Sequence, residues 1–267
     1  MAKSPASPSK RIKFENPPIN ELVIALYHLP IVELKAQHIG IYWLRIRDQF
    51  EFCEQQFPVI SVPNLPETVP NEVFPLPRFW FFSTHHPLLI QLQRNAFMFN
   101  WRRVANAEYP HYETVATEFW KALETYKVFL QESLGAKLDV IQRCELTYVN
   151  IIDASEAFKN VDELPNVLPL AASLTAASTK NRTLAGLNAT VTYRVSPTLL
   201  LDLAIRSGTR AEPKEAAAVL ELKAYGAPAD LSLESARSWY DAAHDATYSL
   251  FLDATGKDMQ RTIWKHR

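Results

Sequence analysis

The stretch that most constrains the fold of this chain is Phe79–Tyr112, in which three short segments with strand character lead into the start of a helix. Phe79–Ser83 is apolar, while Leu88–Gln93 and Ala96–Trp101 alternate between apolar and polar positions. Residues two apart in a strand lie on one face, so one face belongs to the core and the other is semi-polar. Short turn-forming runs separate the segments, and the pattern predicts an antiparallel three-strand meander.

A second meander is predicted in the other half of the chain. In both halves a separate strand precedes the meander, and a long helix follows it, because apolar residues recur there at helical spacing. Gly135 suits a helix end and Ser232 a helix start. The additional strands are predicted at Leu22–Leu29, Leu138–Ile152, Leu187–Val195, Thr198–Arg206 and Ala217–Tyr225, and the two helices at about Tyr109–Leu134 and Ser232–Lys257.

The remaining segments are predicted from spacing and composition. Apolar residues at helical spacing over Glu33–Gln56 predict a third long helix. Residues 1–13 are polar and basic with nothing to bury, so we expect a disordered tail. Phe57–Arg78 is rich in proline and is predicted as a surface loop. Residues 153–185 are predicted as a connection with one short helix near Ser155–Asn160.

Together these elements predict an α+β fold in which long helices pack on an antiparallel sheet. Residues 14–135 and 138–267 share the order of strand, meander and helix. We interpret this order as an internal duplication, although no residue repeat aligns between the two halves. Two arrangements stay open at this point: two separate lobes, or one continuous domain with a sheet of about eight strands.

Composition argues against several classes of function. The formal net charge is -1, so bulk charge favours neither nucleic acid nor an anionic membrane as the main partner. The 6 glycines are not clustered, which disfavours the glycine-rich phosphate loops. Cys53, predicted in a helix, and Cys144, predicted in a strand, lack metal-ligand spacing, and we expect buried free thiols, no metal and no cofactor. Without a membrane-spanning apolar run or a signal-peptide core, we expect a cytoplasmic protein.

A candidate binding surface is predicted where the first meander meets its helix. Guanidinium groups, backbone amides at a helix start and aromatic rings suit a phosphate or a stacked base. The structural alternative, a core tryptophan and arginines paired with Glu108 and Glu113, is favoured because arginine pairs at element ends are common. The residues of this surface are Asn100, Trp101, Arg102, Arg103, Tyr109 and Tyr112.

His244 is the candidate for acid or base chemistry. Asp241 precedes it by three positions on the predicted last helix, so the carboxylate lies on the same face and could orient the imidazole. An ordinary ion pair on the helix surface is the favoured alternative. His85 and His86 are predicted in an exposed turn. No complete catalytic motif is present, which leaves open whether the chain is an enzyme.

Four short motifs give the chain a family resemblance. They are Asn16–Ile19 with Glu21, Asn100–Arg102, Tyr109–Tyr112, and His244 followed by Asp245. With these motifs the chain resembles an uncharacterised, sporadically distributed family of bacterial proteins that carry Asn-Pro-Pro-Ile-x-Glu, Asn-Trp-Arg and Tyr-Pro-x-Tyr. The resemblance implies no catalytic residue, and the patchy distribution implies mobile or defence-linked genes.

The expected function is that of a cytoplasmic binding or interaction protein in a bacterial defence or regulatory system. The motivation is a surplus of aromatic and arginine side chains without a complete catalytic set. The expected partner is another protein, with an anionic or nucleotide ligand as the alternative and no membrane. The competing hypothesis is an enzyme or nucleic-acid-processing factor that uses His244 and Arg102 in a cleft between the halves. A self-associating structural subunit is the third hypothesis, and the oligomeric state stays open.

Overall fold

The computed structural model describes residues 13–59, 76–104, 107–153, 158–176, 181, 184–209 and 216–265. The predicted tail lies outside the described residues except for Lys13, and so do residues 60–75 of the proline-rich loop. The strands are β1 (Ile19–His28), β2 (Phe52–Gln56), β3 (Arg78–Phe82), β4 (Leu88–Gln93), β5 (Ala96–Arg102), β6 (Ile141–Asp153), β7 (Asn188–Ser196), β8 (Leu199–Thr209) and β9 (Ala216–Gly226). The longer helices are α1 (Ala36–Ile46), α2 (Tyr112–Leu134) and α5 (Leu233–Ala254), followed by the short α6 (Lys257–Thr262).

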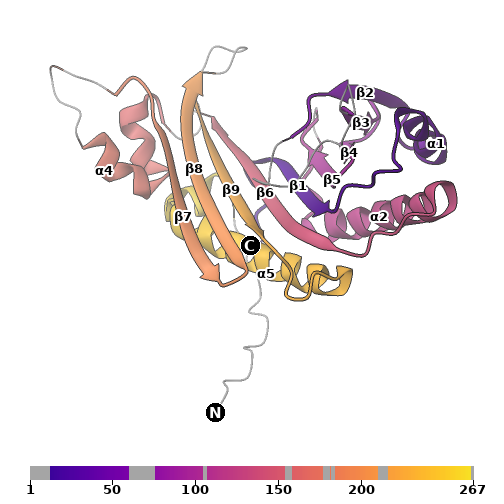
Figure 1. Cartoon of the computed structure of the whole chain (residues 1–267). Coiled ribbons are helices and arrows are strands. Elements are labelled where there is room, and N and C mark those ends of the chain that lie inside the picture. The colour runs from indigo at the N-terminus through magenta and orange to yellow at the C-terminus, as the bar shows by residue number, and fades with distance from the viewer. Residues whose placement is uncertain are drawn as a thin grey trace.

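These strands form one antiparallel sheet in the order β2-β3-β4-β5-β1-β6-β9-β8-β7 (Figure 1). β1 and β6 pair at the junction, so the first strands of the two halves are neighbours. Outward from this pair the strands follow in the same sense, β5-β4-β3 on one side and β9-β8-β7 on the other. The fold is therefore α+β, with both halves joined in one continuous sheet.

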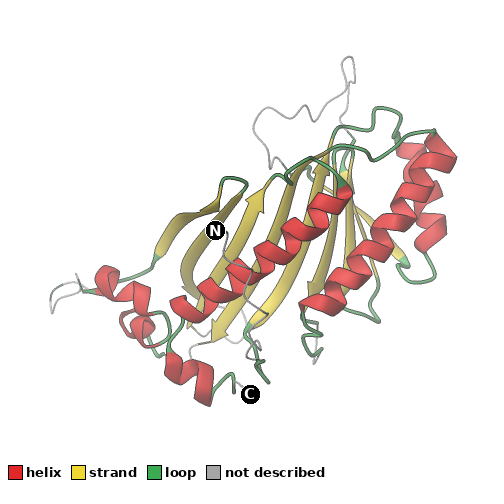
Figure 2. Ribbon diagram, turned by 90° about the horizontal axis from the view of Figure 1, so that it is seen from below, coloured by secondary structure: helices red, strands yellow, loops and turns green. Residues whose placement is uncertain are grey.

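The alternation of side chains separates the two faces of the sheet as predicted. Phe97 and Trp101 of β5 lie in the main core, whereas Asn100 points to the opposite face, where it bonds to another side chain of that face. Long helices lie across the core face (Figure 2). The hydroxyl of Tyr240 on α5 donates to the carbonyl of Ala25 in β1 at 2.6 Å, which fixes this helix over the middle of the sheet.

Both predicted helix ends are confirmed. Gly135 ends α2 in the left-handed conformation (φ 63°), and its N–H donates to the last carbonyls of the helix. The side chain of Ser232 caps α5 by accepting a hydrogen bond from the N–H of Ser235 at 3.1 Å. The helical run predicted up to Lys257 is interrupted after Ala254 and resumes as α6.

The helix predicted over Glu33–Gln56 is wrong in its second half. Only Ala36–Ile46 is helical, and Phe52–Gln56 forms β2, which pairs with β3. The apolar residues of this segment fit a helical spacing. A strand at this position gives β3 a second partner, and a helix could not supply those backbone hydrogen bonds. The sheet therefore has nine strands.

The two cysteines differ in their surroundings. Cys53 lies exposed on β2, which corrects the expectation of a buried thiol in a helix. Cys144 is buried in β6, and burial raises the pKa of its thiol to about 12. Neither is in a disulfide.

The described residues of the connection between β6 and β7 include the short helical turns η1 (Val161–Asn166), η2 (Pro169–Ala171) and α4 (Ala172–Thr175). The short helix predicted at Ser155–Asn160 falls in part outside the described residues, and Asn160 is the cap of η1, with its side chain accepting from the N–H of Asp162 at 3.1 Å. The N–H of Gly256 donates to the carbonyl of Val167 at 2.8 Å and ties this connection to the end of α5.

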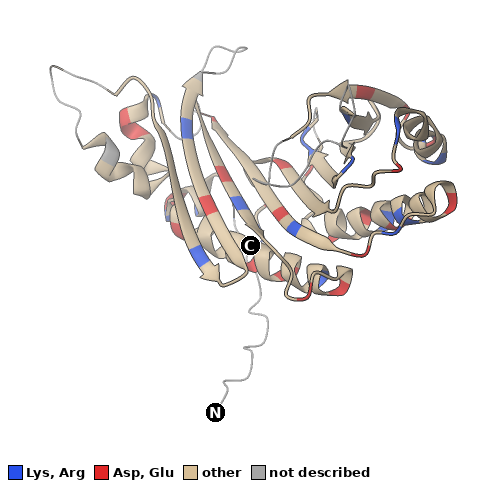
Figure 3. Ribbon diagram, in the orientation of Figure 1, with Lys and Arg blue, Asp and Glu red and all other residues tan. Residues whose placement is uncertain are grey.

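Charged residues of both signs are interspersed along β6, β9 and β8 (Figure 3). Glu145 forms ion pairs with Arg143 at 2.6 Å and with Lys223 at 3.2 Å. Arg206 of β8 and Glu221 of β9 form an ion pair across the two strands at 2.5 Å. This part of the sheet is therefore electrostatically balanced, in line with the low net charge.

Candidate functional site

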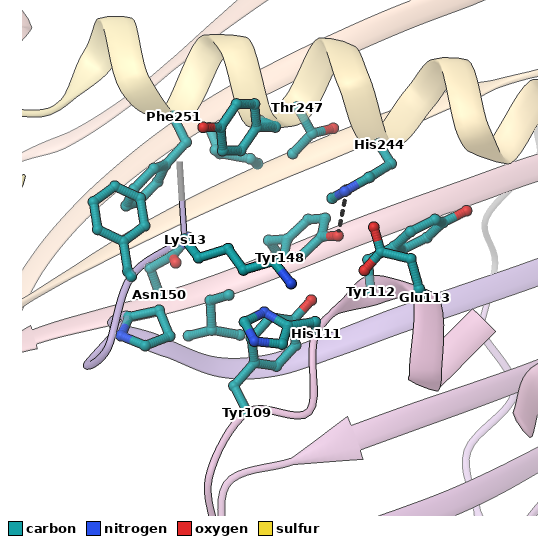
Figure 4. Close-up of a pocket in the computed structure, with 15 residues that line it drawn as sticks. Lys13, Tyr109, His111, Tyr112, Glu113, Tyr148, Asn150, His244, Thr247 and Phe251 are labelled. Atoms are coloured by element: carbon teal, nitrogen blue, oxygen red, sulfur yellow. Dashed lines mark hydrogen bonds between the residues drawn. The ribbon is translucent and has the colours of Figure 1, made fainter. Parts of the chain in front are cut away.

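A pocket of about 120 Å³ lies on the core face of the sheet, between α5 and the residues that lead into α2 (Figure 4). The sheet order creates it, because its floor comes from the adjacent strands β1, β6 and β9. Its lining combines apolar side chains with a group of aromatic and ionisable ones. The apolar residues include Phe14, Pro17, Ile19, Leu222 and Phe251, and the second group includes Lys13, Tyr109, His111, Tyr112, Glu113, Tyr148 and His244.

The buried imidazole of His244 is held on two sides. Its Nδ1 lies 2.8 Å from the hydroxyl of Tyr148, the contact drawn in Figure 4. Its ring stacks on that of Tyr112, with the centroids 4.0 Å apart and the planes inclined by 14°. The hydroxyl of Tyr112 donates to Oδ1 of Asp241 at 3.5 Å. The orientation of the imidazole is therefore fixed, which acid–base catalysis and ligand recognition both need.

Tyr109 lines the same pocket as Tyr148 and His244. Burial raises the pKa of both phenols well above the usual range of tyrosine, so both remain protonated. A hydroxyl donates one hydrogen bond and accepts others. The hydroxyl of Tyr148 can therefore donate to Nδ1 of His244 or accept a hydrogen bond from it.

His111 has a backbone conformation that residues other than glycine rarely adopt. Its φ is 67° and its ψ is 157°, in a region that costs a side-chain-bearing residue about 1–3 kcal/mol. The residue is the N-cap of α2, yet its side chain makes no capping hydrogen bond. Its ring lines the pocket and meets the ring of Tyr109 edge to face at 5.8 Å. Backbone strain of this kind concentrates at functional sites.

The rim of the pocket includes Lys13, whose position is set by its neighbours. The ring of Phe14 packs edge-on against Phe251 at 5.8 Å and against Trp264 at 6.2 Å. The N–H of Asn16 donates to the carbonyl of Trp264 at 3.2 Å. These contacts hold the start of the described chain against α5, so Lys13 extends over the pocket (Figure 4).

Within the described ranges, no group of three or more His, Cys, Asp and Glu side chains is placed to hold a metal ion. The same part of the chain contains no helix that is both long and apolar enough to cross a membrane. The lining of the pocket offers aromatic and aliphatic contact, hydrogen bonding by phenols, imidazoles and the Asn150 amide, the Glu113 carboxylate and the Lys13 ammonium group.

The structure brings part of the predicted site together. Tyr109, Tyr112 and His244 line one pocket, and Asp241 reaches it through the hydroxyl of Tyr112. Tyr148, which sequence analysis did not single out, is the residue that bonds to Nδ1 of His244. These residues come from three separate segments of the chain: the start of α2, strand β6 and helix α5.

Asn100 and Arg102 lie on the opposite face of the sheet. The side chain of Asn100 accepts from Gln91 at 2.8 Å. The guanidinium carbon of Arg102 lies 6.0 Å from the ring centre of Trp80, also on that face. His244 packs on the core face, so the sheet separates it from Arg102. The fold therefore does not bring His244 and Arg102 into a single cleft.

The contacts of Trp101 and Arg103 stabilise the fold. Trp101 is 1% exposed, and its ring packs edge to face on Tyr109 at 5.3 Å. The guanidinium of Arg103 donates to the carbonyls of Ile19 and Pro17, each at 2.9 Å, and so clamps the start of β1. This is a structural use of the arginine, although its partners are carbonyls rather than the neighbouring glutamates.

Sequence reasoning missed Tyr148, Phe14 and Lys13 as site residues. Strand alternation could have indicated Tyr148, since it shares the core face of β6 with Cys144 and carries a hydroxyl that needs a partner. The role of Lys13 depends on contacts of Phe14 with the far end of the chain, for which no local sequence signal exists.

Comparisons with known proteins add little to this geometry. No protein-family model matches the chain, and no curated protein matches it. Among solved structures, the crystal structure of the di-domain ARO/CYC StfQ from the steffimycin biosynthetic pathway is similar at 8% identity over 88% of this chain and 96% of that chain, with a TM-score of 0.17. A likeness at this level carries no argument about fold or function.

Proposed function

We propose that this chain is a binding protein whose pocket receives a small ligand with an apolar body and a hydrogen-bonding head. The observation that carries the proposal is the Tyr148–His244 pair, which presents oriented polar groups within a lining of aromatic and aliphatic side chains. Small-molecule sites have this composition, mostly apolar with a few placed polar groups. The strained backbone of His111 also supports a functional role for this pocket, because backbone strain concentrates at functional sites.

Histidine-selective NMR tests the proposal. The chain has 7 histidines, and His111 and His244 line the pocket, while His85 and His86, in the turn between β3 and β4, do not. Small single-ring compounds titrated into labelled protein are expected to shift the imidazole signals of His111 and His244 and to leave those of the turn unchanged.

The substitution Tyr148→Phe supplies the matched control. It removes the hydroxyl that bonds to His244 and keeps the ring in the core, so compounds that hydrogen-bond at this position should bind about tenfold more weakly. If no compound in the series moves the signals of His111 and His244, the proposed pocket is not a binding site.

An enzyme that uses His244 as acid or base is the second candidate. It is favoured by the hydrogen bond between the Tyr148 hydroxyl and Nδ1 of His244, which holds the imidazole beside a protonated phenol. Ligand recovered with the native protein would be incubated with the wild type and with His244→Gln. Conversion by the wild type alone would establish the enzyme, and an unchanged ligand would leave the binding function.

The cellular setting is a separate proposal. A cytoplasmic location follows the composition, and a role in a bacterial defence or regulatory system, together with a protein partner, rests on the family resemblance and the surplus of aromatic and arginine residues. Co-purification from the host cell followed by mass spectrometry tests the protein partner. A chain recovered alone would argue against it.

The two halves are also proposed to derive from a duplication. The support is the matching order of strands outward from β1 and β6 and the long helix that follows each meander. Superposition of Ile19–Leu134 on Ile141–Ala254 should align β1, β5, β4 and β3 with β6, β9, β8 and β7, and α2 with α5. A superposition that aligns the strands but not the helices would contradict the duplication.

A further inference from the structure

We infer that the ligand of this pocket is an organic acid built on a single ring, with its anionic group held by Lys13. The inference rests on the proposed binding function and specifies its ligand class. It is drawn from the charge on the rim, the size of the cavity and the placement of its polar groups.

The first observation is the position and state of the Lys13 ammonium. Figure 4 shows the side chain reaching across the pocket toward His111 and Tyr148. Within the described part of the chain, Lys13 has no hydrogen bond or ion pair. Glu113, an acidic residue that also lines the pocket, already has an interaction partner. A cation directed over an apolar pocket without a partner is complementary to an anion.

The second observation is the size of the pocket. Its volume of about 120 Å³ is close to that of the cavity of about 150 Å³ that accommodates benzene in another protein. The rings of Phe14 and Phe251 and the side chains of Ile19 and Leu222 supply contacts for one ring of that size.

The third observation is the separation of polar and apolar groups. The hydroxyl of Tyr148 and the imidazoles of His111 and His244 lie together with Lys13 on one side in Figure 4, and Phe251 lies on the other. A ring acid fits this arrangement, with the ring toward Phe251 and the anionic group toward Lys13, where a phenol or imidazole N–H can donate to it as well.

Matched acid and amide probes test the inference. Phenylacetate and phenylacetamide have nearly the same shape and differ in charge, and so do benzoate and benzamide. Their affinities would be measured by NMR titration and calorimetry against the wild type, Lys13→Gln, Lys13→Arg and the surface control Lys121→Gln. Lys121 is exposed on α2 and pairs with Glu118, so its replacement changes net charge equally without touching the pocket.

The acids should bind the wild type about tenfold more tightly than the amides, as expected for one charge-assisted hydrogen bond. Lys13→Gln should remove that preference, Lys13→Arg should keep most of it, and Lys121→Gln should leave it unchanged. Added salt should weaken the acids more than the amides.

Two outcomes would refute the inference, and they differ in what they say about the proposed binding function. If acids and amides bind equally and still shift the His244 signal, the pocket binds small ligands and the assignment of an acid is wrong. If neither acids nor amides bind, both the acid assignment and the proposed binding function are refuted.

Discussion

Replacement of His111 by glycine should give a more stable protein than replacement by alanine, which is the reverse of the usual order of these two substitutions. The residue has φ 67° and ψ 157°, a conformation that costs about 1–3 kcal/mol for any residue with a Cβ. Glycine removes this strain but gains about 0.5–1 kcal/mol of unfolded-state entropy relative to alanine. His111→Gly should therefore be more stable than His111→Ala by about 0.5–2 kcal/mol.

The comparison with alanine isolates the backbone. Both variants lose the imidazole and its edge-to-face contact with Tyr109, worth about 0.5–1.5 kcal/mol, so this loss cancels between them. Urea denaturation followed by circular dichroism measures both free energies of unfolding. At a residue in ordinary backbone geometry, alanine is the more stable of the two by about 0.5–1 kcal/mol. An alanine variant as stable as the glycine variant, or more stable, would refute the assignment of strain to His111.

Two further predictions concern stability away from the pocket. His28 is buried with Nδ1 against the carbonyl of Leu29 at 2.7 Å, and burial lowers its pKa from 6.5 to about 4, so the unfolded chain takes up a proton before the folded one does. This group should therefore leave the free energy of unfolding unchanged above pH 6.5 and lower it by about 3 kcal/mol as the pH drops to 4. Denaturation of His28→Gln at both pH values should not show this loss. Gly226→Ala should lower the free energy of unfolding by about 3 kcal/mol, because a Cβ there would lie 1.9 Å from the carbonyl oxygen of Thr198. Gly208→Ala is the control, since no atom lies within 4 Å of its new Cβ. This control should unfold at nearly the wild-type temperature. Equal melting temperatures for the two glycine variants would contradict this reasoning.

The local pattern of the sequence was sufficient for most elements. Alternation defined the three strands of the first meander within one residue or so, and Gly135 and Ser232 marked the ends at which a helix stops or starts. These features depend on interactions between residues close in the chain, namely the side-chain periodicity of a strand and the capping of a helix. The error at β2 arose where a tertiary partner, the free edge of β3, overrode a helical spacing.

The candidate site was only half predictable for a related reason. Tyr109, Tyr112, Asp241 and His244 could be selected by residue type, yet the same reasoning grouped them with Asn100 and Arg102. Alternation along β5 turns those two side chains away from the core, and the continuous sheet separates the two groups. Residue type therefore identified candidates, and the sheet decided which of them meet.

By itself the sequence determined the class of fold, the meanders, the long helices and the absence of a glycine-rich phosphate loop, because each follows from the spacing of residues close in the chain. Tertiary structure alone decided that β1 pairs with β6, that α5 crosses the middle of the sheet, and that Lys13 lies over the same pocket as Tyr148 and His244. Those contacts join distant segments whose pairing depends on burying one shared core, and no local pattern encodes which distant partner a segment will find.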